Sequence, residues 1–121
     1  MNIKAVRGAT SLESDDAAEM TAAVAELVTE MLSANGVNDE DIVSVLFTAT
    51  PDLHSTFPAT AARTVLSADV PLICAAELDI AGAMPRVVRI LLHAESSLSR
   101  AEVQHVYLRG TDALRADLPH G

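Results

Sequence analysis

One amphipathic helix is the feature that most constrains how this chain folds. Apolar residues recur at helical spacing along a single segment. They are Met20, Val24, Leu27, Val28, Met31 and Leu32. Asp16 and Glu19 resemble a capping box at the start of this segment, and Asn35-Gly36 is typical of a left-handed stop. The opposite face is acidic, so we expect it to face water.

Short apolar and β-branched runs on both sides of this helix predict strands. The strands are expected at residues 3–6, 42–48, 70–76, 87–94 and 105–109. Gly8 permits a sharp exit from the first of them. Shorter helical segments are expected at residues 38–41, at 59–66 after Pro58, and at 99–102, where Ser99 and Glu102 repeat the capping-box pattern.

The order of these elements predicts an α+β fold, a mixed β-sheet with helices on one face. The 121 residues suffice for one domain, and residues 110–121 are expected to form a mobile polar tail. Aromatic residues are few, so the core is built from small side chains, and subunit association is a natural supplement.

The charge excludes several classes of partner. The chain has 17 acidic and 8 basic residues, a net charge of −9, which argues against nucleic acid and against an anionic membrane surface. Its apolar runs are too short to span a bilayer. Cys74 is the only cysteine, so no intrachain disulfide forms. With no signal-peptide pattern at the start, a cytoplasmic location is expected.

Arg89 is the most informative single residue, because it interrupts the apolar run at 87–94. A charge in such a run is costly unless it is paired. Alternation places Arg89 on one face with Val87, Leu91 and His93. The competing interpretation is an edge-strand arginine that reaches solvent, or one held by a structural carboxylate.

Three other side chains could carry chemistry. Tyr107 shares a strand face with His105, although a packed core tyrosine is the simpler explanation. Cys74 lies in an apolar strand and is most simply a small core residue. Glu77 follows that strand with the opposite parity, so Cys74 and Glu77 can serve one site only if the strand ends or bulges near residues 75–76.

Several familiar motifs are absent. The sequence has no glycine-rich phosphate loop, no nucleophile elbow and no histidine spacing suited to a metal site. The remaining arginines, carboxylate, thiol and phenol suit a small anionic ligand. They fit chemistry by positioning and electrostatics better than covalent attack.

The sequence resembles the small monofunctional chorismate mutases of the homotrimeric α/β-barrel class. The matching segments are Val6-Arg7-Gly8-Ala9-Thr10, the FTATPDLH stretch at 47–54, Phe57-Pro58-Ala59, Ala61-Ala62-Arg63, Val70-Pro71, Cys74, Glu77-Leu78-Asp79, Arg89 and His105-Val106-Tyr107-Leu108. The resemblance as a whole covers residues 3–118. The resemblance implies a homotrimer with a pseudo-barrel core and intersubunit active sites. It also implies the cofactor-free [3,3]-sigmatropic rearrangement of chorismate to prephenate in aromatic amino-acid biosynthesis, with no metal.

The resemblance also implies roles for individual residues. Arg89 matches the cation beside the breaking ether bond, and Arg7 and Tyr107 match groups that hold a substrate carboxylate. Glu77 and Cys74 match partners of the ring hydroxyl and of the ring fragment that becomes positive. The remaining substrate-binding matches are Phe57 as a wall, Arg63 and Arg115 as rim cations, and Leu114 as a lid contact.

The sequence departs from the family pattern at two of its substrate-binding positions. Thr60 stands where many relatives carry a lysine, and Ile73 stands where many carry a threonine. Both departures bear on ligand affinity. Because the substrate is a dianion, we also expect the acidic helix face with Glu26 and Glu30 to point away from the site.

Two alternative functions remain open at this level. One is a small trimeric deaminase-like enzyme on a related architecture, which does not explain why Arg7, Glu77 and Tyr107 occur together. The other is a non-catalytic carboxylate-binding module.

Overall fold

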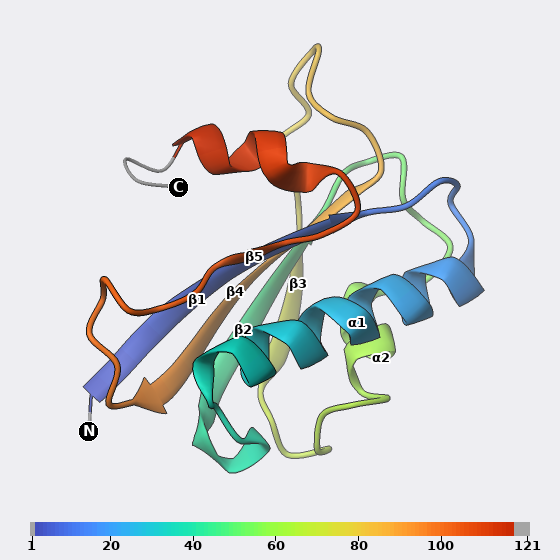
Figure 1. Ribbon diagram of the computed structural model, residues 1–121. Coiled ribbons are helices and arrows are strands. Elements are labelled where there is room, and N and C mark those ends of the chain that lie inside the picture. Colours follow the sequence, from blue (N-terminus) through green and yellow to red (C-terminus); the bar gives the residue numbers. More distant parts are fainter. Residues whose placement is uncertain (1, 118–121) are drawn as a thin grey trace.

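A mixed five-stranded sheet organises the chain, with the strand order β3-β2-β4-β1-β5 (Figure 1). The computed structural model describes residues 2–117, with side chains described as far as Leu114. The elements are β1 (Asn2–Ser11), α1 (Ala17–Asn35), the 3-10 turn η1 (Asp39–Asp41), β2 (Ile42–Ala49), α2 (Pro58–Ala62), β3 (Leu72–Ala76), β4 (Val87–Ser96), β5 (Val106–Tyr107) and the 3-10 helix η2 (Thr111–Asp117). Strand β4 pairs antiparallel with β1 and β2, while β3 and β5 add in parallel at the two edges.

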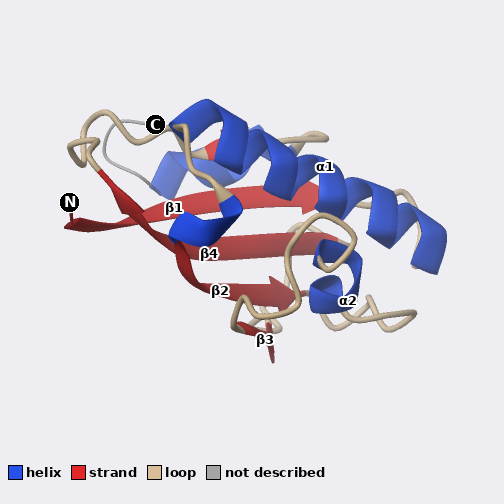
Figure 2. Cartoon of the chain, turned by 90° about the horizontal axis from the view of Figure 1, so that it is seen from below, coloured by secondary structure: helices blue, strands red, loops and turns tan. Residues whose placement is uncertain are grey.

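Both α-helices lie on the same face of the sheet (Figure 2). The core fills the space between them and the strands, with Met20, Leu27 and Phe47 fully buried. Among residues 2–117 no α-helix covers the other face. The predicted α+β fold, a mixed sheet with helices on one face, is therefore confirmed. No helix in the described part of the chain is long and apolar enough to cross a membrane.

The caps of α1 form largely as predicted. The Asp16 carboxylate accepts a hydrogen bond from Glu19 N at 2.9 Å, and Gly36 ends the helix in the left-handed conformation. The Glu19 carboxylate instead accepts from the backbone of Glu13 and Ser14. The hydrogen bond from the Glu13 N–H lowers the pKa of the Glu19 carboxyl most. The Ser14 N–H and hydroxyl lower it further, while partial desolvation opposes the shift. The capping box is thus only half formed.

Gly8 does not end the first strand. It lies in the middle of β1, opposite Ile90 of β4. A Cβ at this position would collide with the Met31 sulfur and would press on Leu27. The absence of a side chain therefore lets α1 approach the sheet, so the predicted sharp exit is wrong.

Other predicted elements are shorter than expected or absent; the strand predicted at 70–76, for example, is β3 and begins at Leu72. Helix α2 stops at Ala62, and β5 holds only Val106–Tyr107. Residues 99–102 form a turn instead of a helix. The Glu102 carboxylate accepts a hydrogen bond from Ser99 N at 2.7 Å, but no helix follows. In the predicted mobile tail, residues 111–117 form η2, and residues 118–121 lie outside the described residues. The mobility of the tail stays a prediction.

The loop between β2 and α2 is held by two carboxylates. Asp15 Oδ1 accepts from the N–H groups of His54 and Ser55 at 3.1 and 3.0 Å. Asp52 accepts from the Thr50 hydroxyl at 2.6 Å and from Arg86 N at 3.0 Å. These bonds fix the path of the chain just before Phe57.

Candidate functional site

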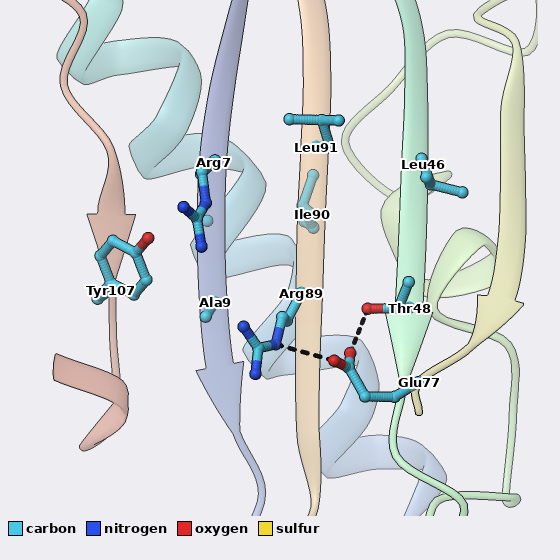
Figure 3. A pocket seen from close by; sticks show the side chains of 10 residues that line it. Arg7, Ala9, Leu46, Thr48, Glu77, Arg89, Ile90, Leu91 and Tyr107 are labelled. Atoms are coloured by element: carbon cyan, nitrogen blue, oxygen red, sulfur yellow. Dashed lines mark hydrogen bonds and ion pairs between the residues drawn. The ribbon is translucent and has the colours of Figure 1, made fainter. Parts of the chain in front are cut away.

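The uncovered face of the sheet contains a cavity of about 350 Å³ that crosses four neighbouring strands (Figure 3). Its lining residues are Arg7, Gly8, Ala9, Leu46, Thr48, Glu77, Arg89, Ile90, Leu91 and Tyr107. Helix α1 packs on the opposite face, through Met31 against Gly8. The acidic helix face therefore lies away from the cavity, as predicted.

Arg89 is placed in the cavity by strand alternation. Its side chain leaves β4 on the uncovered face, while Val88 and Ile90 enter the core. Ala9 of β1 and Thr48 of β2 are its register partners on the two sides. Strand β4 lies at the centre of the sheet, so the interpretation of Arg89 as an edge-strand arginine is wrong.

Glu77 reaches Arg89 from the end of β3. The strand stops at Ala76, and Glu77 N donates a hydrogen bond to Ala49 O at 2.9 Å. The carboxylate then crosses β2, and its Oε1 lies 3.1 Å from Arg89 Nε. The Arg89 side chain is 37% exposed and that of Glu77 is 19% exposed, so the ion pair is only partly screened by solvent.

Arg7 and Tyr107 complete the charged and polar part of the cavity. The backbone N–H of Arg7 donates to His105 Nδ1 at 2.9 Å, which ties β1 to the segment leading into β5. Tyr107 pairs with Ala9 in the parallel ladder. In Figure 3 the Tyr107 phenol lies beside Arg7, on the side of the cavity away from Glu77.

Cys74 is separated from these residues. It is the register partner of Phe47, and it packs half-buried against the hydrophobic core. The strand end required for a shared site is present, but this chain alone does not bring Cys74 into the cavity. A catalytic role for Cys74 stays a prediction.

The predicted substrate-binding residues whose side chains are described also lie outside this cavity. Phe57 and Ile73 are 69% and 64% exposed, and Thr60 is exposed on α2. The Arg63 guanidinium donates to the carbonyls of Ser67 and Val70. Leu114 is half-buried in η2, and the side chain of Arg115 lies outside the described residues.

The part that Thr48 plays in the cavity was not predicted from the sequence. Its hydroxyl donates to Glu77 Oε2 at 2.5 Å, and the residue lines the cavity. Alternation within 42–48 puts Thr48 on a face with Leu46, but only the pairing with β4 brings it to Arg89. Among the described residues no group of His, Cys, Asp or Glu side chains is arranged to hold a metal ion.

Two guanidiniums, a carboxylate and a phenol around one open cavity are the groups expected in a protein of the class that binds small organic anions. Comparison with known proteins identifies the family within this class. The family model for chorismate mutase type I matches residues 3–118. The chain therefore belongs to the chorismate mutase type I family, as the sequence resemblance indicated.

Individual relatives agree over nearly the full chain. The chorismate mutase AroH of Thermus thermophilus is 41% identical over 117 residues, 96% of each protein. The chorismate mutase AroH of Bacillus subtilis is 34% identical over 119 residues, 98% of this chain and 94% of the relative. A solved chorismate mutase from Clostridium thermocellum superposes with a TM-score of 0.88 at 35% identity, covering 91% of this chain and 98% of that one. The deaminase-like alternative has no support in these similarities.

Proposed function

We propose that the cavity on the uncovered face is the active site of a chorismate mutase, an isomerase that converts chorismate to prephenate in aromatic amino-acid biosynthesis. The observation that carries the proposal is the position of Arg89. Glu77 engages its Nε, and its two terminal nitrogens point away from Glu77 toward β1 (Figure 3). A preformed cation thus faces the space between Arg7, Tyr107 and Glu77.

The reaction needs positioning and electrostatics, and this site supplies both. In the rearrangement one C–O bond breaks while one C–C bond forms, and negative charge grows on the ether oxygen. We assign the terminal nitrogens of Arg89 to that oxygen, because a fixed cation stabilises the charge without reorganisation. Arg7 and Tyr107 hold a substrate carboxylate, and Glu77 meets the ring hydroxyl and the ring fragment that becomes positive.

The proposed assembly is a homotrimer with a pseudo-barrel core and active sites between subunits. Exposed apolar side chains support this assembly, since a soluble monomer seldom presents so many around one edge. They include Phe57, Val65, Ile73, Leu78 and Ile80, which lie on or next to α2 and β3. Phe57, Thr60, Arg63, Cys74 and Ile73 of one subunit would then meet the cavity of the next, with Leu114 and Arg115 at its rim.

The charge of the protein is compatible with a dianionic substrate. The net charge of −9 repels the ligand at long range, but screening limits that repulsion to about 8 Å at physiological salt. Within that distance Arg7 and Arg89 dominate the cavity. We further propose a cytoplasmic location and no nucleic-acid or membrane partner.

The direct test is chorismate consumption by the purified protein without added metal or cofactor, with prephenate identified as product. We expect saturable turnover. A folded protein that binds chorismate without converting it would overturn the proposal and favour the carboxylate-binding module.

Mixing two impaired variants tests the intersubunit site. Phe57→Ala removes the exposed wall, and Arg89→Ala removes the cation, so the proposal assigns the two defects to different subunits of each site. After unfolding and refolding as a 1:1 mixture, about a quarter of the sites in random trimers have both native residues. We expect activity to rise toward that fraction, well above either variant refolded alone.

A mixture no more active than the average of its two parents would show that Phe57 and Arg89 do not combine across subunits. Refolding each variant with itself is the control for recovery. Sedimentation velocity on the same samples reports the assembly state.

A further inference from the structure

The Thr48 hydroxyl is a polar group of the cavity that has no part in the proposed substrate contacts. It donates to Glu77 Oε2 at 2.5 Å, which is within the range of a charge-assisted O–H···O⁻ bond. Thr48 is half-buried on β2 and is the direct register partner of Arg89. The Glu77 carboxylate therefore has one oxygen on Thr48 and the other on Arg89 (Figure 3).

The two contacts fix different properties of the carboxylate. Arg89 Nε lies 3.1 Å from Oε1, but the pair is not aligned as a hydrogen bond. The ion pair therefore fixes the distance between the two charges, but it restrains the rotation of the Glu77 carboxylate less firmly. The short bond from Thr48 sets that rotation, because it holds Oε2 on the side away from Arg89.

We propose that Thr48 is a positioning residue that keeps Glu77 from forming a two-pronged pair with Arg89. The inference rests on the proposed function. An arginine and a carboxylate prefer two parallel hydrogen bonds when nothing else restrains them. Such a fork would engage one of the terminal nitrogens that now point into the cavity. By holding Oε2, Thr48 leaves both terminal nitrogens available to the substrate.

Thr48→Val tests this role, because it removes the hydroxyl and keeps the branched shape. We expect kcat to fall about 10–100-fold, since a small misplacement of a catalytic group has effects of that size. KM changes much less, because Arg7 and Tyr107 still bind the carboxylate. Thr48→Ser keeps the donor and should restore kcat to near the wild-type value.

Thr10→Val is the matched control. Thr10 lies on β1, which β4 separates from β2, is fully buried, and has a hydroxyl with no hydrogen-bond partner among the described residues. The same substitution there leaves the cavity intact, so kcat stays unchanged. Equal losses in the Thr10 and Thr48 variants would indicate a general effect on the sheet and would overturn the proposal.

A double-mutant cycle separates positioning from structural damage. If Thr48 acts through Glu77, Thr48→Val has no further effect on kcat in a Glu77→Ala background. A further loss in that background, similar to the loss in the wild type, would contradict the role.

The outcomes distinguish this inference from the proposed function. If the wild type converts chorismate and Thr48→Val does so equally well, the role of Thr48 is overturned and the chorismate mutase assignment stands. If the wild type is inactive, the chorismate mutase assignment fails. The crystal structure of Thr48→Val then tests whether Thr48 orients the Glu77 carboxylate. A Glu77 carboxylate rotated into a fork with Arg89 supports the inference, and an unmoved carboxylate overturns it.

Discussion

Replacing Arg89 with alanine lowers kcat for chorismate by about 10²–10³, equivalent to roughly 3–4 kcal/mol of transition-state stabilisation. The guanidinium is the group that faces the proposed ether oxygen, and no other side chain of the cavity occupies that position. The fold survives the change, because the guanidinium of Arg89 lies on the uncovered face of the sheet and the hydrophobic core lies on the opposite face. Steady-state kinetics and the thermal midpoint of the same preparation measure the two effects separately.

Two further variants control this experiment. Arg89→Lys keeps the charge but loses the planar arrangement of donors, so it recovers only part of the lost rate. Arg100→Ala removes an exposed arginine outside the cavity and leaves kcat unchanged. If Arg89→Ala lost its fold along with its activity, Arg89 would instead be a structural partner of Glu77.

The parts of the fold that were predictable depend on local chemistry. The apolar stripe and its two ends define α1, since Asp16 and Gly36 act within a few residues of the helix. The place of Gly8 in the packing could not be predicted from local chemistry. Its role depends on Met31, a residue far along the chain, and only the packed structure brings the two together.

The site was predictable to the extent that alternation and family resemblance describe it. Alternation puts Arg89 and Leu91 on one face, and both line the cavity. Thr48 was missed because its importance depends on its register with Arg89, which no local pattern encodes. The exposed positions of Phe57 and Ile73 could not be predicted either, because they depend on how the edge beyond β2 is built.

The second large effect concerns stability, and it uses the two phenylalanines of the chain. Phe47 is fully buried in β2 beneath the helices. Truncating a buried phenylalanine to alanine costs about 3–5 kcal/mol, since it removes apolar contacts and leaves a cavity. Domains of this size are stable by only about 5–15 kcal/mol. Phe47→Ala therefore lowers the midpoint of urea unfolding sharply and reduces the yield of folded protein.

Phe57→Ala is the matched control, because it deletes the same side chain from a site that is 69% exposed in the single chain. The side chain makes few contacts within its own subunit, so the unfolding midpoint falls much less than in Phe47→Ala. The substitution instead lowers turnover, because it removes the proposed wall of the intersubunit site. A Phe47→Ala protein with the wild-type midpoint would show that Phe47 contributes no packing to the core. A Phe57→Ala protein with full turnover would remove Phe57 from the site, so the pair of variants separates what holds the subunit together from what completes its active site.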